Sequence, residues 1–180
     1  MKIKLNSGKY VVAVSGGVDS VVLLDIVTKK KNLQLVVAHF DHGIRSDSDQ
    51  DLKFVRELAA KYGLEFVSGQ GNLGEDASED TARKARYDFL RKVAKETKAD
   101  VIITAHHEND VLETALINLT RGTGRKGLSS LGSGSEIIRP LLYYKKSQIT
   151  DYAIDNNLEW REDSTNQSDK YLRNRIRQKL

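Results

Sequence analysis

The sequence predicts an α/β protein with a doubly wound, Rossmann-like parallel sheet of five strands and helices on both faces. First, short apolar runs typical of buried strands alternate with longer stretches of helical periodicity. Second, the polar clusters of the chain lie at the ends of these strands or in the helices that follow. This placement is typical of doubly wound parallel sheets, in which the active residues lie beyond the carboxyl ends of the strands. The 180 residues suffice for one sizeable core, so one domain is expected.

The individual elements are predicted from local apolar patterns. The strands are expected at Tyr10–Val14, Leu35–His39, Leu64–Ser68, Val101–Thr104 and the short run Ile137–Ile138. The helices are expected at Val18–Lys30, Gln50–Tyr62, Glu79–Thr97, Glu108–Thr120 and Ser147–Asn156. The glycine- and serine-rich stretch Gly122–Gly134 is expected to be a connecting loop.

Composition narrows the class of protein. No apolar run approaches membrane-spanning length, and polar residues interrupt the N-terminus where a secretory signal would be apolar, so we expect a cytoplasmic protein that does not bind membranes. The sequence contains no cysteine, which excludes disulfides, iron–sulfur clusters and thiolate zinc sites from this chain. The net charge is +4, and Lys170–Leu180 holds five cations and no acid. This segment is either a contact for a polyanion or a solvated helix end.

A glycine turn joins the first predicted strand to the first predicted helix. In Ser15–Ser20, the glycines Gly16 and Gly17 let the backbone approach an anion, and the N–H groups of the helix start at Val18 point toward it. The hydroxyls of Ser15 and Ser20 add donors. The turn therefore predicts a phosphate-binding loop, although no Gly-Lys-Ser/Thr follows as in the common ATP-binding motif.

Asp19 is an unusual residue for such a loop, because a carboxylate repels a bound anion unless a cation lies between them. This position indicates a magnesium ion that bridges Asp19 to phosphate oxygens. The alternative is an ordinary acidic residue in the first turn of a helix.

Further polar residues lie near the same predicted sheet edge. The run His39–Arg45 follows the second strand and favours contacts with adenosine or substrate over a zinc site, although His39 is equally explained as a hydrogen-bonded strand-end residue. On the third helix, Glu79, Arg83 and Arg86 share one face, and a surface pair of Glu79 with Arg83 explains this spacing as well as a functional role does. Asp110 and Glu113 also face one direction, which indicates a cationic ligand unless each faces water.

The chain resembles a known family in several ordered segments. Ser15–Ser20 is similar to the pyrophosphate loop (PP-loop) of the N-type ATP pyrophosphatases, which cleave ATP between the α and β phosphates. Within that superfamily the chain resembles the tRNA(Ile)-lysidine synthetases across nearly its whole length. The matching segments are Ser15–Ser20, His39–Arg45, Glu79–Tyr87, Ala105–Thr114, Arg121–Gly124 with Gly127-Leu128, Arg139–Leu142, and Asp163–Asn166 with Tyr171–Arg177.

The resemblance implies an adenine nucleotide alpha hydrolase-like fold and a specific reaction. These enzymes use ATP to ligate free lysine to carbon 2 of the wobble cytidine, position 34, of tRNA(Ile) with a CAU anticodon. The cytidine oxygen attacks the α-phosphate, and the lysine side-chain amine then displaces AMP. ATP and magnesium are the implied cofactors. Residues 1–160 would form the catalytic domain, and residues 161–180 a basic segment that contacts tRNA or begins a further region.

The resemblance also implies roles for individual residues. Asp110 and Glu113 would hold the lysine substrate, Arg86 would face its carboxylate or the phosphate, and Asp19 would hold magnesium. Ala38 and His39 would lie beside the adenosine. Arg121 and Gly122 would line the entrance for the nucleotide or base, although a helix C-cap explains Gly122 equally well. The sequence departs from the family pattern at Asn109, Val111 and Lys146, where aspartate, glutamine and arginine are usual.

Three other functions remain open. Another PP-loop enzyme could act on tRNA, but the sulfur transfer known in that superfamily uses cysteines that this chain lacks. A PP-loop enzyme could instead amidate a small molecule, which would leave the basic C-terminal segment without a purpose. A non-enzymatic nucleotide-binding module would not need the acidic pair Asp110 and Glu113.

Overall fold

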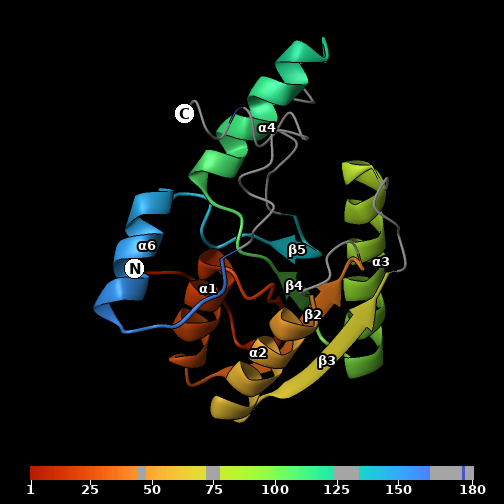
Figure 1. The fold of residues 1–180 in the computed structure, drawn as a ribbon. Helices are drawn as coiled ribbons and strands as arrows, with labels where there is room; N and C mark the ends of the chain where they lie inside the picture. The colour runs from red at the N-terminus through yellow and green to blue at the C-terminus, as the bar shows by residue number, and fades with distance from the viewer. Residues whose placement is uncertain (44–47, 72–77, 124–133, 163–175, 177–180) are drawn as a thin grey trace.

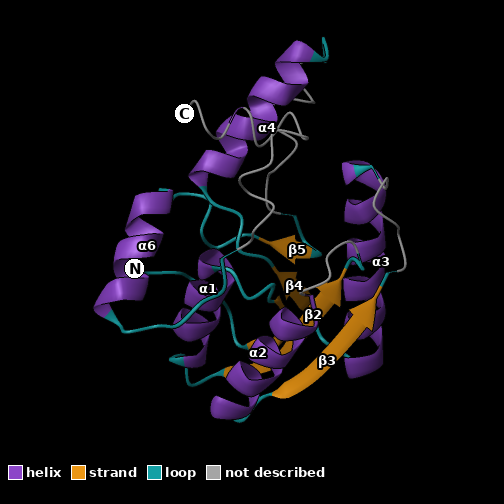
Figure 2. Ribbon diagram, in the orientation of Figure 1, coloured by secondary structure: helices purple, strands orange, loops and turns teal. Residues whose placement is uncertain are grey.

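The computed structural model describes residues 1–43, 48–71, 78–123, 134–162 and 176. Strands and helices alternate along the chain (Figure 2). The strands are β1 (Gly8–Ala13), β2 (Leu33–Asp41), β3 (Glu65–Gln70), β4 (Val101–Ile103) and β5 (Ile137–Ile138). The helices are α1 (Val18–Thr28), α2 (Ser48–Lys61), α3 (Glu79–Thr97), α4 (Glu108–Thr120) and α6 (Lys146–Asp155). Each predicted element is present, with ends within two residues of the prediction.

The strands form one parallel sheet in the order β3-β2-β1-β4-β5 (Figure 1). In the centre, Val12 of β1 pairs with Val37 of β2 and with Ile103 of β4. The chain builds outward from β1 to β3 and then returns to the other side of β1. The strand order therefore reverses between β1 and β4, and ligands of such sheets bind at the carboxyl ends of the strands at that point.

Alternate residues of the central strands pack into two separate cores, one on each face of the sheet. Val12 and Ile103 belong to the core on the face covered by α1, α2 and α6. Val11 and Ile102 belong to the core on the opposite face, where α3 contributes Leu90. The prediction of a doubly wound sheet is confirmed.

Helix α1 is buried on nearly all sides. Val21, Val22, Leu23 and Leu24 are each at most 1% exposed, because α1 lies between the sheet and α6. Such a helix needs apolar residues all round, which explains the unbroken run Val-Val-Leu-Leu. The helix that carries the glycine turn at its N-terminus is therefore firmly held.

A polar network between α1 and α6 holds these two helices together. The carboxylate of Asp25 is 5% exposed and accepts hydrogen bonds from the hydroxyls of Tyr62 (3.0 Å) and Tyr152 (2.8 Å). Lys29 Nζ lies 2.7 Å from the same carboxylate. Burial and the neighbouring Asp25 carboxylate raise the pKa of Tyr62 to about 12. The network fixes α6 against α1 and α2.

Helix α4 projects beyond the carboxyl edge of the sheet (Figure 1). Its residues Leu112, Leu116 and Leu119 are 50%, 38% and 57% exposed. Their spacing predicted the helix correctly, but not that this apolar face would be exposed. No helix in the described part of the chain is both long enough and apolar enough to cross a membrane.

Candidate active site at the reversal of strand order

The glycine turn after β1 is braced from within by Ser20. The backbone N–H groups of Ser15 and Gly16 each donate to Ser20 Oγ at 3.2 Å, and this hydroxyl donates to the Gly17 carbonyl at 2.8 Å. Gly16 has φ +99°, which a residue with a side chain rarely adopts. Ser20 thus shapes the loop, and the first turn of α1 at Val18 and Asp19 presents the N–H groups that a helix start leaves free for an anion.

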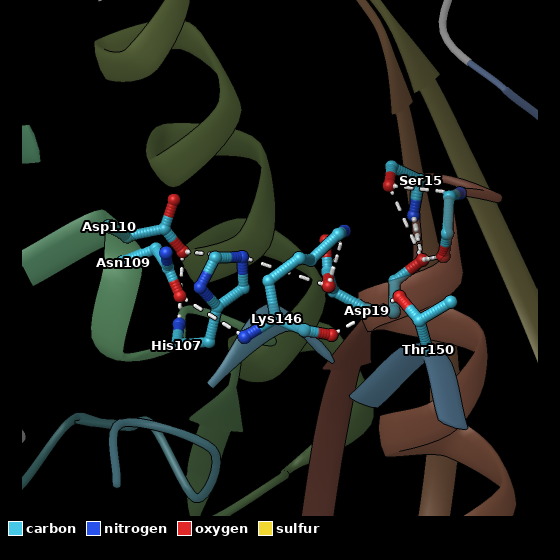
Figure 3. Close-up of polar contacts among 9 residues, drawn as sticks. Ser15, Asp19, His107, Asn109, Asp110, Lys146 and Thr150 are labelled. Carbon is cyan, nitrogen blue, oxygen red and sulfur yellow. Dashed lines mark hydrogen bonds and ion pairs between the residues drawn. The ribbon is translucent and has the colours of Figure 1, made fainter. Parts of the chain in front are cut away.

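Asp19 contacts a lysine 127 positions further along the chain. Lys146 Nζ, from the first residue of α6, lies 2.7 Å from both carboxylate oxygens of Asp19 (Figure 3). The Lys146 side chain is 44% exposed and that of Asp19 is 28% exposed, so solvent screens the pair. A protein cation therefore lies beside Asp19 and the glycine turn.

His107 lies between two acidic residues of the site (Figure 3). Its Nε2 is 3.7 Å from Asp19 Oδ1 and 3.6 Å from Asp110 Oδ2. The ring is 4% exposed, and among the described residues its Nδ1 has no hydrogen-bond partner. Both distances are longer than a hydrogen bond, so these are close polar contacts. His107 thereby connects Asp19 on α1 to Asp110 on α4.

The two carboxylates of α4 are shielded from solvent. Asp110 Oδ2 accepts the backbone N–H of His107 at 2.9 Å, and its side chain is 14% exposed. Glu113 is 1% exposed. The alternative that each simply faces water is wrong. Within the described residues no group of three His, Cys, Asp or Glu side chains could hold a metal by itself.

The end of β2 lies beside the base of the glycine turn. His39 Nδ1 is 2.9 Å from the Val14 carbonyl, so Nδ1 carries the proton and Nε2 is left as an acceptor. The Ala38 methyl is packed in the core, and the Ala38 carbonyl accepts the Val14 N–H at 2.9 Å. Burial, followed by the charge of Arg86, lowers the pKa of His42 to about 4. Arg86 on α3 therefore acts electrostatically on this end of the sheet.

Arg121 and Gly122 lie at the far end of α4 from the site. The 13 residues of this helix span roughly 20 Å. Gly122 has φ +70°, its N–H bonds to Leu119, and Thr123 bonds back to Asn118, which together form a Schellman C-cap. The C-cap explanation of Gly122 therefore describes its local structure, and the described fold does not bring these two residues to the glycine turn.

Sequence reasoning did not include His107 or Lys146 among the site residues. His107 directly precedes α4 at the carboxyl edge of the sheet. This position could have indicated a site residue from the sequence alone. Lys146 was noted as a departure from the arginine usual in the family, at the position of an anion contact, but its contact with Asp19 was not predicted. Its backbone N–H bonds to Asn109 Oδ1 at 3.1 Å, which fixes α6 against α4.

The described C-terminal residues return to the glycine turn. The Arg161 N–H donates to the Gly16 carbonyl at 2.9 Å, and its side chain donates to Asp51 at 3.1 Å. Several predictions fall outside the described residues: those for the loop at 124–133, for the basic residues of 163–175 and 177–180, for Arg45, and for the Glu79 side chain.

Comparison with known proteins identifies close relatives of the chain. The tRNA(Ile)-lysidine synthase of Rickettsia bellii is 40% identical over 183 residues, which cover 96% of this chain and 42% of the relative. The enzyme of the same name from Thermotoga maritima is 40% identical over 187 residues, which cover 98% of this chain and 45% of the relative. The chain thus spans less than half the length of these curated relatives.

Solved structures share the fold at low sequence identity. The U34-tRNA thiolase NcsA from Methanococcus maripaludis, solved with its [4Fe-4S] cluster, superposes with a TM-score of 0.74 at 21% identity, over 88% of this chain and 60% of that one. The NMN synthetase of Francisella tularensis gives 0.58 at 15% identity, over 85% of this chain and 63% of that one.

A match over nearly the whole sequence shows the family to which the chain belongs. The model of the family described as the PP-loop domain matches residues 2–180, which include the glycine turn, the Asp19–His107–Asp110 cluster and Lys146. The chain belongs to the PP-loop domain family.

Proposed function

We propose that this chain is the catalytic domain of an ATP-dependent ligase that joins free lysine to carbon 2 of the wobble cytidine, position 34, of tRNA(Ile) with a CAU anticodon. One observation carries the proposal: His107 links the glycine turn, through Asp19, to the shielded carboxylate Asp110. This cluster occurs in a sequence 40% identical to curated tRNA(Ile)-lysidine synthases.

The first half of the reaction is adenylation of the cytidine. Its oxygen attacks the α-phosphate of ATP, and pyrophosphate leaves. The N–H groups at the start of α1 would bind the departing pyrophosphate and stabilise its charge. The neighbouring ends of β1 and β2 would receive the adenosine, with the His39 Nε2 acceptor and the Ala38 backbone on one side.

The residues present fit magnesium in the way this ion usually binds nucleotides. Magnesium takes one or two carboxylates and completes its shell with phosphate oxygens and water. Asp19 offers one partly exposed carboxylate beside the phosphate loop and is the residue that would hold the ion, in place of the Lys146 ammonium that contacts both of its oxygens at 2.7 Å. When bound, magnesium would neutralise charge on the phosphates.

The second half is displacement of AMP by the lysine amine. An alkylammonium group with a pKa near 10.4 is almost fully protonated at neutral pH, so the site must hold the cation and then let it lose a proton. The shielded carboxylates Asp110 and Glu113 would bind the ammonium. The guanidinium of Arg86 would face the lysine carboxylate or the phosphate, as its planar donor geometry allows.

Product analysis tests this function directly. The chain is incubated with ATP, radiolabelled lysine and anticodon stem-loops that carry C, U or G at the wobble position, and the nucleosides are then analysed. We expect labelled lysidine only with the wobble cytidine. In a parallel reaction, the chain replaces the matching residues of the full-length Thermotoga maritima relative. Absence of lysidine with both proteins would refute the proposal.

Substitution of the acidic residues separates the proposal from its alternatives. Asp110→Asn should abolish lysine-dependent AMP release but preserve ATP binding. Glu108→Gln, in the same first turn of α4 but outside the cluster, is the matched control. Another PP-loop ATP pyrophosphatase would release AMP with a different substrate, and a non-enzymatic nucleotide-binding module would release none. A cytoplasmic location, where tRNA is found, is part of the proposal.

A further inference from the structure

Outside the site described above, an open groove of about 400 Å³ lies between α3 and the end of β5. We call it the α3 groove; its polar and aromatic lining consists of Asp80, Arg83, Lys84, Tyr87, Arg91 and Arg139. Four of these residues are cations and one is an acid. The described lining contains a single aliphatic residue, Ile137, so the groove is suited to an anion rather than to an apolar ligand.

The cations of the groove are arranged around Tyr87. Arg139 is 7% exposed, and its Nη2 donates to the Tyr87 hydroxyl at 3.3 Å. The Arg83 guanidinium lies 4.9 Å from the centre of the Tyr87 ring. Burial alone would raise the pKa of Tyr87, but the charges of Arg83, Arg86 and Arg139 outweigh it and lower the pKa. The local field therefore favours negative charge.

Two of the cations are available for a ligand. Arg91 is already paired, because its Nε lies 2.7 Å from Glu136 Oε1. By contrast, neither Arg83 nor Lys84 forms an ion pair with any described carboxylate. Among the described residues, therefore, no ion pair neutralises their charges, which add to the potential of the groove.

The α3 groove opens at the same edge of the sheet as the site. Arg139 directly follows β5, and β5 pairs with β4, whose carboxyl end leads to His107. A ligand that reaches the site between the ends of these strands can therefore also contact the groove.

We propose that the α3 groove binds a backbone phosphate of the RNA close to the nucleotide that is modified. The inference rests on the proposed function, because it assigns this phosphate to the same RNA substrate. Arginine is suited to the contact, since its guanidinium can donate two hydrogen bonds to one phosphate. Such a contact fixes the position of the RNA but does not read its sequence.

The test compares two double variants of α3 with the same loss of charge. Arg83→Gln with Lys84→Gln removes the two groove cations that form no ion pair with a described carboxylate. Lys92→Gln with Lys95→Gln removes two exposed cations nearer the C-terminal end of the helix and is the control. Binding of an anticodon stem-loop is measured as a function of salt, and ATP binding is measured in parallel.

For the groove variant we expect RNA binding to weaken about tenfold, and the plot of log K against log salt to become less steep by about 0.7, the value for one lost phosphate contact. The loss should be equal for stem-loops with C or U at the wobble position, and ATP binding should not change. Equal RNA binding by the groove and control variants would overturn the inference, as would a loss of ATP binding instead. Since RNA binding is measured without turnover, failure of the proposed reaction in the wild-type protein remains a separate result.

Discussion

Replacement of Asp25 by alanine should strongly destabilise the fold. Asp25 is the shared acceptor of Tyr62 and Tyr152, and these bonds fix α6, the helix that begins with Lys146, against α1, the helix that begins at the glycine turn. The alanine variant leaves both tyrosine hydroxyls without their acceptor. The phosphate loop and the residue that contacts Asp19 would then lose their common support.

The size of the effect follows from the three partners of the carboxylate. Each partly buried hydroxyl that loses its acceptor costs about 1–3 kcal/mol. The ion pair with Lys29 adds little, because the Lys29 side chain is 54% exposed and regains water. The expected loss is therefore about 2–6 kcal/mol, and in a chain of this length it corresponds to a decrease in Tm of roughly 4–24 °C.

Urea unfolding followed by tryptophan fluorescence measures this loss. Trp160 is the single tryptophan of the sequence and packs against the core that contains α1 and α6, so its emission reports on this layer. The control is Asp151→Ala, an exposed residue of α6, which should change the free energy of unfolding by less than about 0.5 kcal/mol. An Asp25→Ala variant as stable as this control would refute the reasoning.

Three further predictions concern glycines and pH. Gly69→Ala should destabilise by about 1–3 kcal/mol, because its Cβ would lie 2.5 Å from the Phe89 ring; Phe89→Leu should restore part of the loss in urea unfolding, and no restoration would contradict a steric cause. Gly16→Ala, at φ +99°, should weaken ATP binding in calorimetry, whereas Gly134→Ala should not; equal affinities would argue against a phosphate loop. The raised pKa of Tyr62 means that the folded state keeps a proton that the unfolded state loses, so stability should fall between pH 10 and about 12. Tyr62→Phe should make this fall smaller, and an unchanged pH dependence of the urea midpoint would contradict the assignment.

The elements of the fold were predictable because their signals are local. Strand, glycine turn and helix follow one another within Gly8–Thr28, and each is specified by neighbouring residues. The alternation of such units predicted a parallel sheet, since right-handed crossovers leave few other arrangements. The ends of α3 and α4 agree with the prediction, because the apolar spacing and the flanking residues mark them clearly.

The surroundings of Asp19 were not predictable in the same way. The carboxylate beside a phosphate loop predicted a nearby cation. No local pattern, however, indicates that the ammonium of Lys146, 127 residues later, would contact it. The spacing of Asp110 and Glu113 placed them on one side of a helix, yet only packing decides whether that side faces water or the protein. The leucines of α4 show the reverse: their spacing is typical of a buried helix face, but in the structure this face is exposed.

The amino-acid sequence by itself determined the strands, the helices, the glycine turn and the chemical types of the residues near it, because each depends on neighbours in the chain. Only the tertiary structure decided that Lys146 meets Asp19, that His107 lies between Asp19 and Asp110, and that cations of α3 line one groove with Arg139, which follows β5. These contacts join segments far apart in sequence, and they form because the reversal of strand order brings the carboxyl ends of β1 and β4 side by side.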